Sequence, residues 1–216
     1  MLRLKALFRA RAIRTTGGGV YNPTKRAVWV AQLPEQGARL RADTLYAQFD
    51  VLQAQRKKAK AAMVTEAKRD PAWGVLETIP YYGPVRIALL LATIGTPWRF
   101  RTKRNLWAYS GLAVVTVTSS EYEFVDGRAR RRQRQPLIRG LNRNHNRVLK
   151  NVFKGAATAA TGKPGPLQDL YHGMLERGMR KELARVTLAR KIAALTLRLL
   201  KTGEVFDSNE LTRPQT

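Results

Sequence analysis

The chain has 216 residues, and its 40 Lys and Arg against 15 Asp and Glu give a net charge of +25. Hydrophobic residues make up 44% of it, which is enough for a core and excludes a disordered polycation of the histone-tail kind. Cysteine is absent, so a disulfide framework, a cysteine zinc site and a cysteine nucleophile are excluded as well. The excess positive charge favours a polyanion as partner, and nucleic acid and anionic membrane are the usual ones.

Residues 1–74 are predicted to form a helical connector. Residues 2–13 have the pattern of a helix end, which three glycines at 17–19 terminate. A longer helix is expected from Ala31 or Pro34 to about Asp70, with a heptad-like apolar seam. The seam residues are Leu45, Phe49, Leu52, Ala59 and Met63. A simple helical hairpin and a dimerising coiled coil fit this pattern equally well.

Residues 76–95 are predicted to form two short helices joined by a tight turn of proline and glycine. The turn resembles the helix-hairpin-helix motif, except that Tyr81 replaces the first of its two glycines. Gly83 would allow a phosphate to approach the backbone, and the N–H groups near Arg86 at the start of the second helix could bind it. The alternative is an ordinary turn between two core helices.

Residues 99–150 hold 13 basic and 3 acidic side chains, and this block is predicted to bind nucleic acid. Aromatic and basic residues alternate from 97 to 112, where Thr102 is expected to cap a short helix that Gly111 ends. The candidate nucleic-acid-binding residues are Gly83, Arg86, Arg99, Arg101, Lys103, Arg104, Arg128, Arg130, Arg131, Arg132, Arg134, Arg139, Arg143 and Arg147.

The expected fold is mainly α. A long helical connector or coiled-coil hairpin at 1–74 precedes a helical domain at 75–206, which contains the helix-hairpin-helix-like motif and one small β-hairpin. The hairpin is expected near residues 113–126, with strands at 114–118 and 121–125. Further helices are expected at 141–160, 167–177 and 180–201, followed by a flexible tail at 207–216.

Few groups in this sequence offer catalytic chemistry. Glu121, Glu123 and Asp126 are the only acidic cluster in the basic half, and charge balancing is a more common role for such a cluster than a weak metal site. Ser119 and Ser120 stand at a predicted strand end, where a serine could attack a phosphodiester. No base is adjacent to activate them, so on local sequence an ordinary strand end is the better interpretation.

Several short motifs are carried in a fixed order along the chain. They are Ile79-Pro80, Gly83-Pro84, Ile94-Gly95, Arg99-Phe100, Leu106-Trp107-Ala108-Tyr109-Ser110-Gly111-Leu112, Ser119-Ser120, Arg139-Gly140-Leu141-Asn142-Arg143, Ala189-Arg190-Lys191-Ile192-Ala193 and Gly203-Glu204. In order and spacing, residues 75–206 resemble the C-terminal half of the bacterial insertion-sequence transposases of the one-ten/one-sixteen type, which are recombinases guided by a bridge RNA.

The resemblance implies a DNA-binding part of a transposase that cuts and joins DNA through a serine nucleophile, with Ser119 and Ser120 as candidates. In the family, an N-terminal resolvase-like domain supplies four carboxylates that hold magnesium. That domain is expected before residue 1, so no cofactor is expected in this chain, and Mg²⁺ only with that domain. This chain alone is therefore expected to bind without cleaving. It departs from the family after the serines, where Glu121 replaces a glycine and a longer hairpin follows.

The expected partners are DNA and a structured guide RNA, with a homo-oligomer formed through the helical connector and no membrane. The resemblance places such a protein in the bacterial cytoplasm, associated with the nucleoid. The alternative from another class is a basic structural protein of the ribosome or nucleoid, which binds nucleic acid without covalent chemistry.

Overall fold

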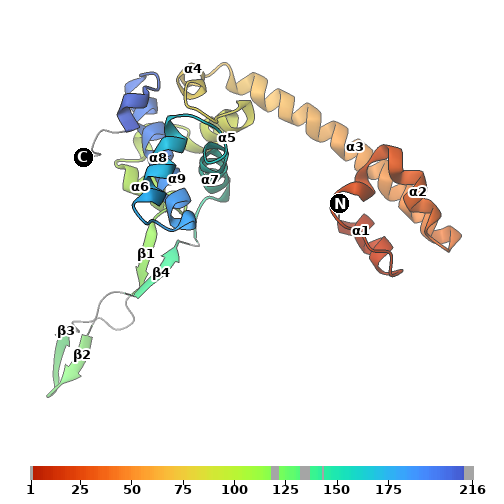
Figure 1. Ribbon diagram of the computed structural model, residues 1–216, viewed down its shortest axis with the longest axis horizontal. Coiled ribbons are helices and arrows are strands. Elements are labelled where there is room, and N and C mark those ends of the chain that lie inside the picture. Colours follow the sequence, from red (N-terminus) through yellow and green to blue (C-terminus); the bar gives the residue numbers. More distant parts are fainter. Residues whose placement is uncertain (1, 118–121, 132–136, 143, 212–216) are drawn as a thin grey trace. The chain divides into compact units, whose positions relative to one another are not determined.

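The computed structural model describes residues 2–117, 122–131, 137–142 and 144–211 (Figure 1). The described chain is mainly helical with a small β part, which confirms the expected fold class. It divides into two compact units, Met1–Ala62 and Met63–Thr216, each of which is described by itself. No helix among the described residues combines the length and apolarity that crossing a membrane requires.

The first unit is built around the N-terminal half of one long helix. Its elements are α1 (Leu2–Arg9), η1 (Gly19–Tyr21), η2 (Pro23–Lys25), α2 (Arg26–Ala31) and α3 (Gln36–Ala67), the last of which continues into the second unit. A small core joins them, and its buried members are Leu4, Leu7, Phe8, Val20, Leu33, Ala38, Ala42 and Tyr46. The Tyr46 hydroxyl donates to the Val20 carbonyl at 2.9 Å. Beyond this core, every residue of α3 from 51 to 62 is exposed, including the seam residue Leu52.

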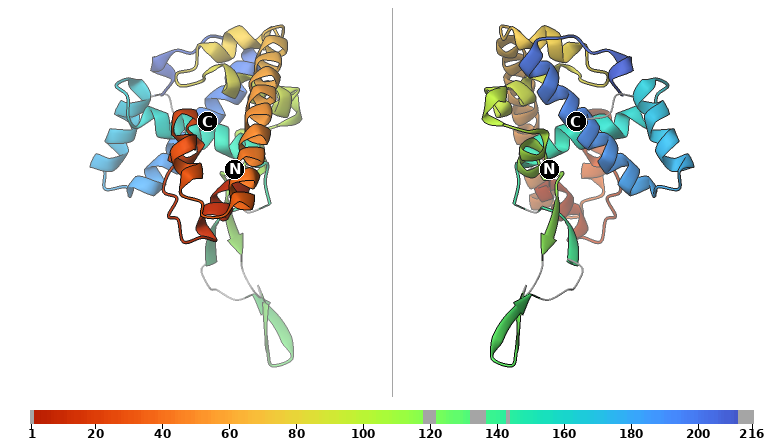
Figure 2. Two further views of the ribbon diagram at one scale, coloured as in Figure 1. Left: turned by 90° about the vertical axis from the view of Figure 1, so that its right-hand side faces the viewer. Right: turned by 90° about the vertical axis from the view of Figure 1, so that its left-hand side faces the viewer.

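The second unit is a helical domain packed around its last long helix. Its helices are α4 (Ala72–Glu77), α5 (Pro84–Ile94), η3 (Pro97–Arg99), α6 (Lys103–Tyr109), α7 (Arg147–Ala160), α8 (Pro166–Glu176), α9 (Lys181–Thr202) and η4 (Ser208–Leu211). Helix α9 is buried along most of its length and contacts α4, α6, α7 and α8, as Figure 2 shows from two sides.

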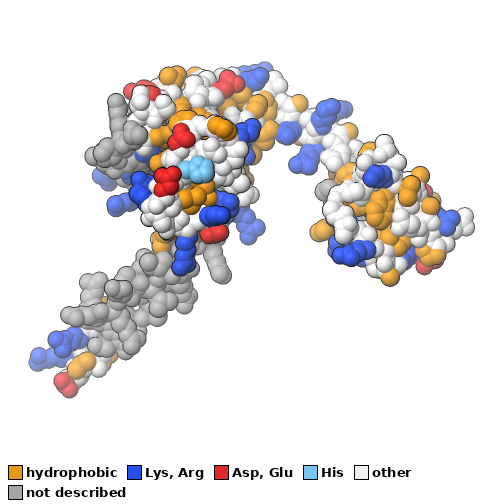
Figure 3. All heavy atoms as spheres, viewed as in Figure 1, with side chains coloured by type: hydrophobic (Ala, Val, Ile, Leu, Met, Phe, Trp, Pro, Cys, Tyr) orange, Lys and Arg blue, Asp and Glu red, His pale blue; other side chains and the backbone are white. Residues whose placement is uncertain are grey.

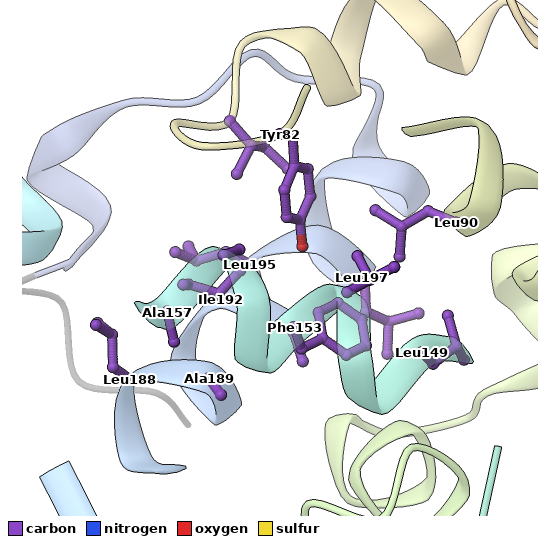
Figure 4. Close-up of a cluster of buried hydrophobic side chains, with 14 of the residues drawn as sticks. Tyr82, Leu90, Leu149, Phe153, Ala157, Leu188, Ala189, Ile192, Leu195 and Leu197 are labelled. Atoms are coloured by element: carbon purple, nitrogen blue, oxygen red, sulfur yellow. The ribbon is translucent and has the colours of Figure 1, made fainter. Parts of the chain in front are cut away.

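The α7 and α9 interface forms the centre of this core. Phe153 of α7 and Ile192 of α9 both belong to the cluster of side chains drawn in Figure 4, and both are fully buried. The ring of Tyr82 enters the same cluster from the turn before α5, and its hydroxyl lies 2.7 Å from the hydroxyl of Thr196. Burial of these apolar side chains stabilises the domain by roughly 25 cal/mol per Å² removed from water.

The β part differs from the expected pairing. Strand β1 (Val114–Val117) pairs antiparallel with β4 (Leu137–Leu141), and β2 (Tyr122–Val125) pairs antiparallel with β3 (Arg128–Arg131). The hairpin therefore spans 122–131, and the expected pairing of 114–118 with 121–125 is wrong. Asp126 and Gly127 both have positive φ, 51° and 74°, as a two-residue type I′ turn requires, and this turn brings β2 onto β3.

Most helix ends lie where capping residues in the sequence predicted them. Thr102 caps α6 by accepting the Asn105 N–H, and Gly203 ends α9 in the left-handed conformation. The helix expected from 141 begins later, at α7, because Leu141 ends β4 and the side chain of Asn146 supplies the cap. Within the segment expected to be a flexible tail, η4 forms and Leu211 is buried in the core.

Candidate nucleic-acid interface

The segment 106–112 forms a sharp corner where α6 ends. Gly111 has a φ of +67°, and the N–H groups of Leu112 and Ala113 both donate to the Trp107 carbonyl, at 2.8 and 3.1 Å. The buried hydroxyl of Ser110 donates to the Leu106 carbonyl at 2.7 Å. These bonds satisfy the last carbonyls of α6 and turn the chain into β1, so this motif has a structural role.

Two distant segments attach to this corner. The Arg190 Nε of α9 donates to the Leu112 carbonyl at 2.6 Å, and the indole N–H of Trp107 donates to the Arg190 carbonyl at 3.0 Å. The N–H of Asn146, which caps α7, donates to the Tyr109 carbonyl at 2.8 Å. Burial lowers the pKa of Arg190. The corner therefore joins the motifs at 106–112 and 189–193, which the sequence separates by more than 75 residues.

Gly111 is also the point of closest approach in the corner. A Cβ at this position would lie 2.4 Å from Cγ of the His145 ring. The ring packs against the corner, and its buried Nδ1 has no hydrogen-bond partner among the described residues. The geometry therefore requires glycine at position 111 for two reasons, the positive φ and the space that His145 fills.

In the turn before α5, a tyrosine has a backbone conformation that glycine usually adopts. Tyr81 has a φ of +69°, and its hydroxyl donates to the Lys163 carbonyl at 3.0 Å. Arg86 Nη1 donates to the Tyr81 carbonyl at 2.6 Å, so this guanidinium holds the turn. Gly83 caps α5, and no atom lies within 4 Å of the place its Cβ would take. Of the two predicted phosphate contacts, Gly83 has open space beside its backbone, whereas the guanidinium of Arg86 donates a hydrogen bond within the turn.

Basic side chains surround the start of α6. The Arg99 guanidinium lies 4.8 Å from the centre of the Tyr109 ring, on exposed surface, and Arg101 and Arg104 are exposed too. Lys103 is half-buried beside α9, where burial and the charge of Lys103 lower the pKa of Lys191. Among the residues that the structure describes, no carboxylate forms an ion pair with Arg99, Arg101 or Arg104. This arrangement leaves the positive charge available to an anion.

The other candidates divide into three groups. Arg128 and Arg130 are exposed on β3, and Arg147 is exposed in the first turn of α7. Arg131 and Arg139 belong to β3 and β4, where the structure describes the backbone. The remaining candidates lie outside the described residues, and they are Ser119, Ser120, Arg132, Arg134 and Arg143.

Sequence reasoning overlooked two features of this region. Lys191 follows Arg190 in a motif that the sequence already singled out, so its charge could have been included. The side chain of Trp98 is exposed, with the Lys201 ammonium 5.3 Å from its ring. The alternation of aromatic and basic residues from 97 to 112 pointed to Trp98, but nothing in it pointed to Lys201.

A metal site does not fit the described residues. No group of three or more His, Asp or Glu side chains among them could hold a metal ion. Asp126 lies in the hairpin turn, while Glu121 is outside the described residues.

Comparison with known proteins gives two similarities. Residues 74–141 match the Transposase IS116/IS110/IS902 family, and this match contains both the turn before α5 and the corner. The chain is also similar to a protein of Streptomyces coelicolor described as "Insertion element IS110 uncharacterized 43.6 kDa protein", with 26% identity over 165 residues. That similarity covers 76% of this chain and 38% of the relative, so the chain spans about two fifths of the relative's length. Together the two matches confirm the resemblance to the IS110 family of transposases.

Proposed function

We propose that this chain binds DNA within an insertion-sequence transposase, through the basic surface of its second unit. The observation that carries the proposal is the exposed cluster of Arg99, Arg101 and Arg104, which lies inside the family match and beside the corner. Arginines without carboxylate partners bind phosphate oxygens and release the counterions of DNA. Such contacts position a protein on DNA without reading its sequence.

The test is the salt dependence of DNA affinity, measured by fluorescence anisotropy on duplexes of unrelated sequence. Replacing Arg99, Arg101 and Arg104 together by Ala should reduce the slope of log K against log salt by about 2 to 3, since each phosphate contact contributes about 0.9. The matched control replaces three exposed basic residues, Arg177 and Arg180 of the connection between α8 and α9 and Lys181 at the start of α9. Equal losses in both variants would mean that net charge, rather than this surface, sets the affinity.

The proposed nucleophile is one serine of the pair Ser119 and Ser120, because β1 leads from the corner directly to them and the resemblance assigns a serine there. The serine hydroxyl would lose its proton, its Oγ would form a bond to phosphorus, and the bond from phosphorus to the bridging oxygen would break. That oxygen would leave with one strand end and take up a proton. Ser119→Ala and Ser120→Ala, separately and together, would be scored on a denaturing gel for a covalent adduct with DNA. This chain alone is expected to give no adduct, and its fusion to the carboxylate domain of a family member is expected to give one. An adduct from the double variant would exclude both serines.

The structured guide RNA, the homo-oligomer and the nucleoid location belong to the same proposal. Helix α3 supports the homo-oligomer, because exposed Val51 and Leu52 lie on a stretch that neither core covers. Light scattering of the chain and of Leu52→Glu would test it, since a charge in a helix seam should dissociate an oligomer. If the parent chain and Leu52→Glu have the same molar mass in solution, this seam is excluded as an interface.

A further inference from the structure

The β2–β3 hairpin gathers two aromatic residues on one of its faces. Its register places Tyr122 opposite Arg131, Glu123 opposite Arg130, Phe124 opposite Ala129 and Val125 opposite Arg128. Opposite residues of an antiparallel pair share a face and alternate residues of a strand point to opposite faces, so Tyr122 and Phe124 share one face with the positions of Ala129 and Arg131. The other face carries Val125, Arg128 and Arg130, and the position of Glu123 lies opposite Arg130 on it.

The aromatic face has no cover from the rest of the described chain. The side chain of Phe124 is 80% exposed and that of Tyr122 is 56% exposed. Ala129 opposite Phe124 is small, so the ring of Phe124 has no cross-strand partner of its own size. In Figure 3, basic, hydrophobic and acidic side chains all lie at the tip of this hairpin. Two exposed aromatic rings on a two-stranded ribbon bury too little area to stabilise it, which indicates a contact with a ligand.

We propose that the aromatic face of this hairpin stacks on unpaired bases of a nucleic acid, while the arginines of β3 contact the phosphates. This inference rests on the proposed function and names a ligand class for one part of the surface. In the register of β2 and β3, the aromatic face has an arginine position, Arg131, and no carboxylate position, so its charge favours a polyanion over an apolar protein surface. Stacking favours unpaired bases, because both faces of a base inside a duplex are covered by its neighbours. Single-stranded DNA and RNA loops present the same base faces, so the experiment includes both.

The test compares Phe124→Ile with Phe124→Trp in the full chain. Isoleucine keeps the apolar character and the strand propensity but removes the aromatic face, whereas tryptophan keeps that face. Binding is measured by anisotropy on three labelled probes: a 20-nucleotide dT strand, a U strand of the same length and a mixed-sequence duplex. Val125→Ala on the opposite face is the matched control, because Val125 is also exposed and apolar.

We expect Phe124→Ile to weaken binding of the single strands about 5- to 150-fold, the range for one base stacked on one aromatic ring. Phe124→Trp and Val125→Ala should stay within about twofold of the parent chain, and no variant should change duplex binding. Retained affinity in Phe124→Ile, or an equal loss on the duplex, would overturn the stacking proposal. If only one of the DNA and RNA strands responds, that strand is the ligand. Failure of the parent chain to bind any probe would instead overturn the proposed function.

Discussion

Replacing Gly111 by alanine should destabilise the second unit more than the same change at any open glycine. Two costs add at this position. The left-handed backbone with φ of +67° costs a residue with a Cβ about 1–2 kcal/mol. The new Cβ would lie 2.4 Å from Cγ of His145, so either the ring or the corner must move, and overpacking of this kind costs about 1–3 kcal/mol. The expected loss is therefore about 2–5 kcal/mol.

Gly203 provides a matched control in the same unit. Its φ is +73°, close to that of Gly111, but no atom lies within 4 Å of the place its Cβ would take. Gly203→Ala should therefore carry only the backbone cost of about 1–2 kcal/mol. The difference between the two variants isolates the contact with His145.

Urea unfolding followed by far-UV circular dichroism measures both variants. With a slope of about 2 kcal/mol per M, the extra cost at Gly111 should lower the midpoint by about 0.5–1.5 M relative to Gly203→Ala. Hydrogen exchange at the N–H groups of Leu112 and Ala113 reports on the corner itself, because both donate to the Trp107 carbonyl. Equal midpoints for the two variants would refute the close approach. Adding His145→Ala to Gly111→Ala should recover part of the loss, and strict additivity would refute it as well.

Three further perturbations address other parts of the chain. Asn146→Ala should lower the thermal stability by about 1 kcal/mol, because its side chain caps α7; exposed Asn144→Ala is the control. The hydrogen bond from Arg26 lowers the pKa of Asp50, so this stabilisation is present above the ordinary pKa of 3.8 and is lost as the pH falls through the lowered value. Asp50→Asn should therefore flatten the acid limb of a stability profile, and an unchanged limb would contradict this. Burial raises the pKa of Tyr82, so stability should fall as the pH rises above about 10, where the unfolded chain loses this proton. Tyr82→Phe should remove that fall, and a profile identical to the parent's would contradict it.

The helical framework could be predicted because its signals are local. Thr102 and Gly203 mark helix ends through their own side chain or lack of one, and the apolar stripe of α9 follows from its periodicity. The strand pairing could not be predicted in the same way. Strand β1 pairs with β4, whose residues lie 20 or more positions further along the chain, while the Asp126-Gly127 turn pairs β2 with β3. The expected single hairpin paired 114–118 with 121–125, although β3 is the strand that follows β2 directly across the turn.

The sequence predicted which kinds of residue make up the candidate site, but not what each residue does there. The exposed arginines around α6 follow from a basic block interleaved with aromatic residues. The bond from Arg86 to the Tyr81 carbonyl is invisible in the sequence, since it depends on a left-handed tyrosine. The bond from Arg190 to Leu112 depends on how α9 packs against the corner. The aromatic face of the hairpin was missed because it requires the register of β2 on β3.

Substitutions in the corner and in the hairpin should lower DNA affinity for different reasons, which a binding assay alone cannot distinguish. The bond from Arg190 to the corner ends on the Leu112 backbone carbonyl, so a substitution at Arg190 changes the geometry of the fold and, through it, the position of the basic surface. Affinity and stability should therefore fall together. A substitution at Phe124 removes a side chain that buries almost nothing, so affinity should fall while the unfolding midpoint stays fixed. Measuring both quantities on both variants assigns each loss either to the helical framework or to a direct contact with nucleic acid.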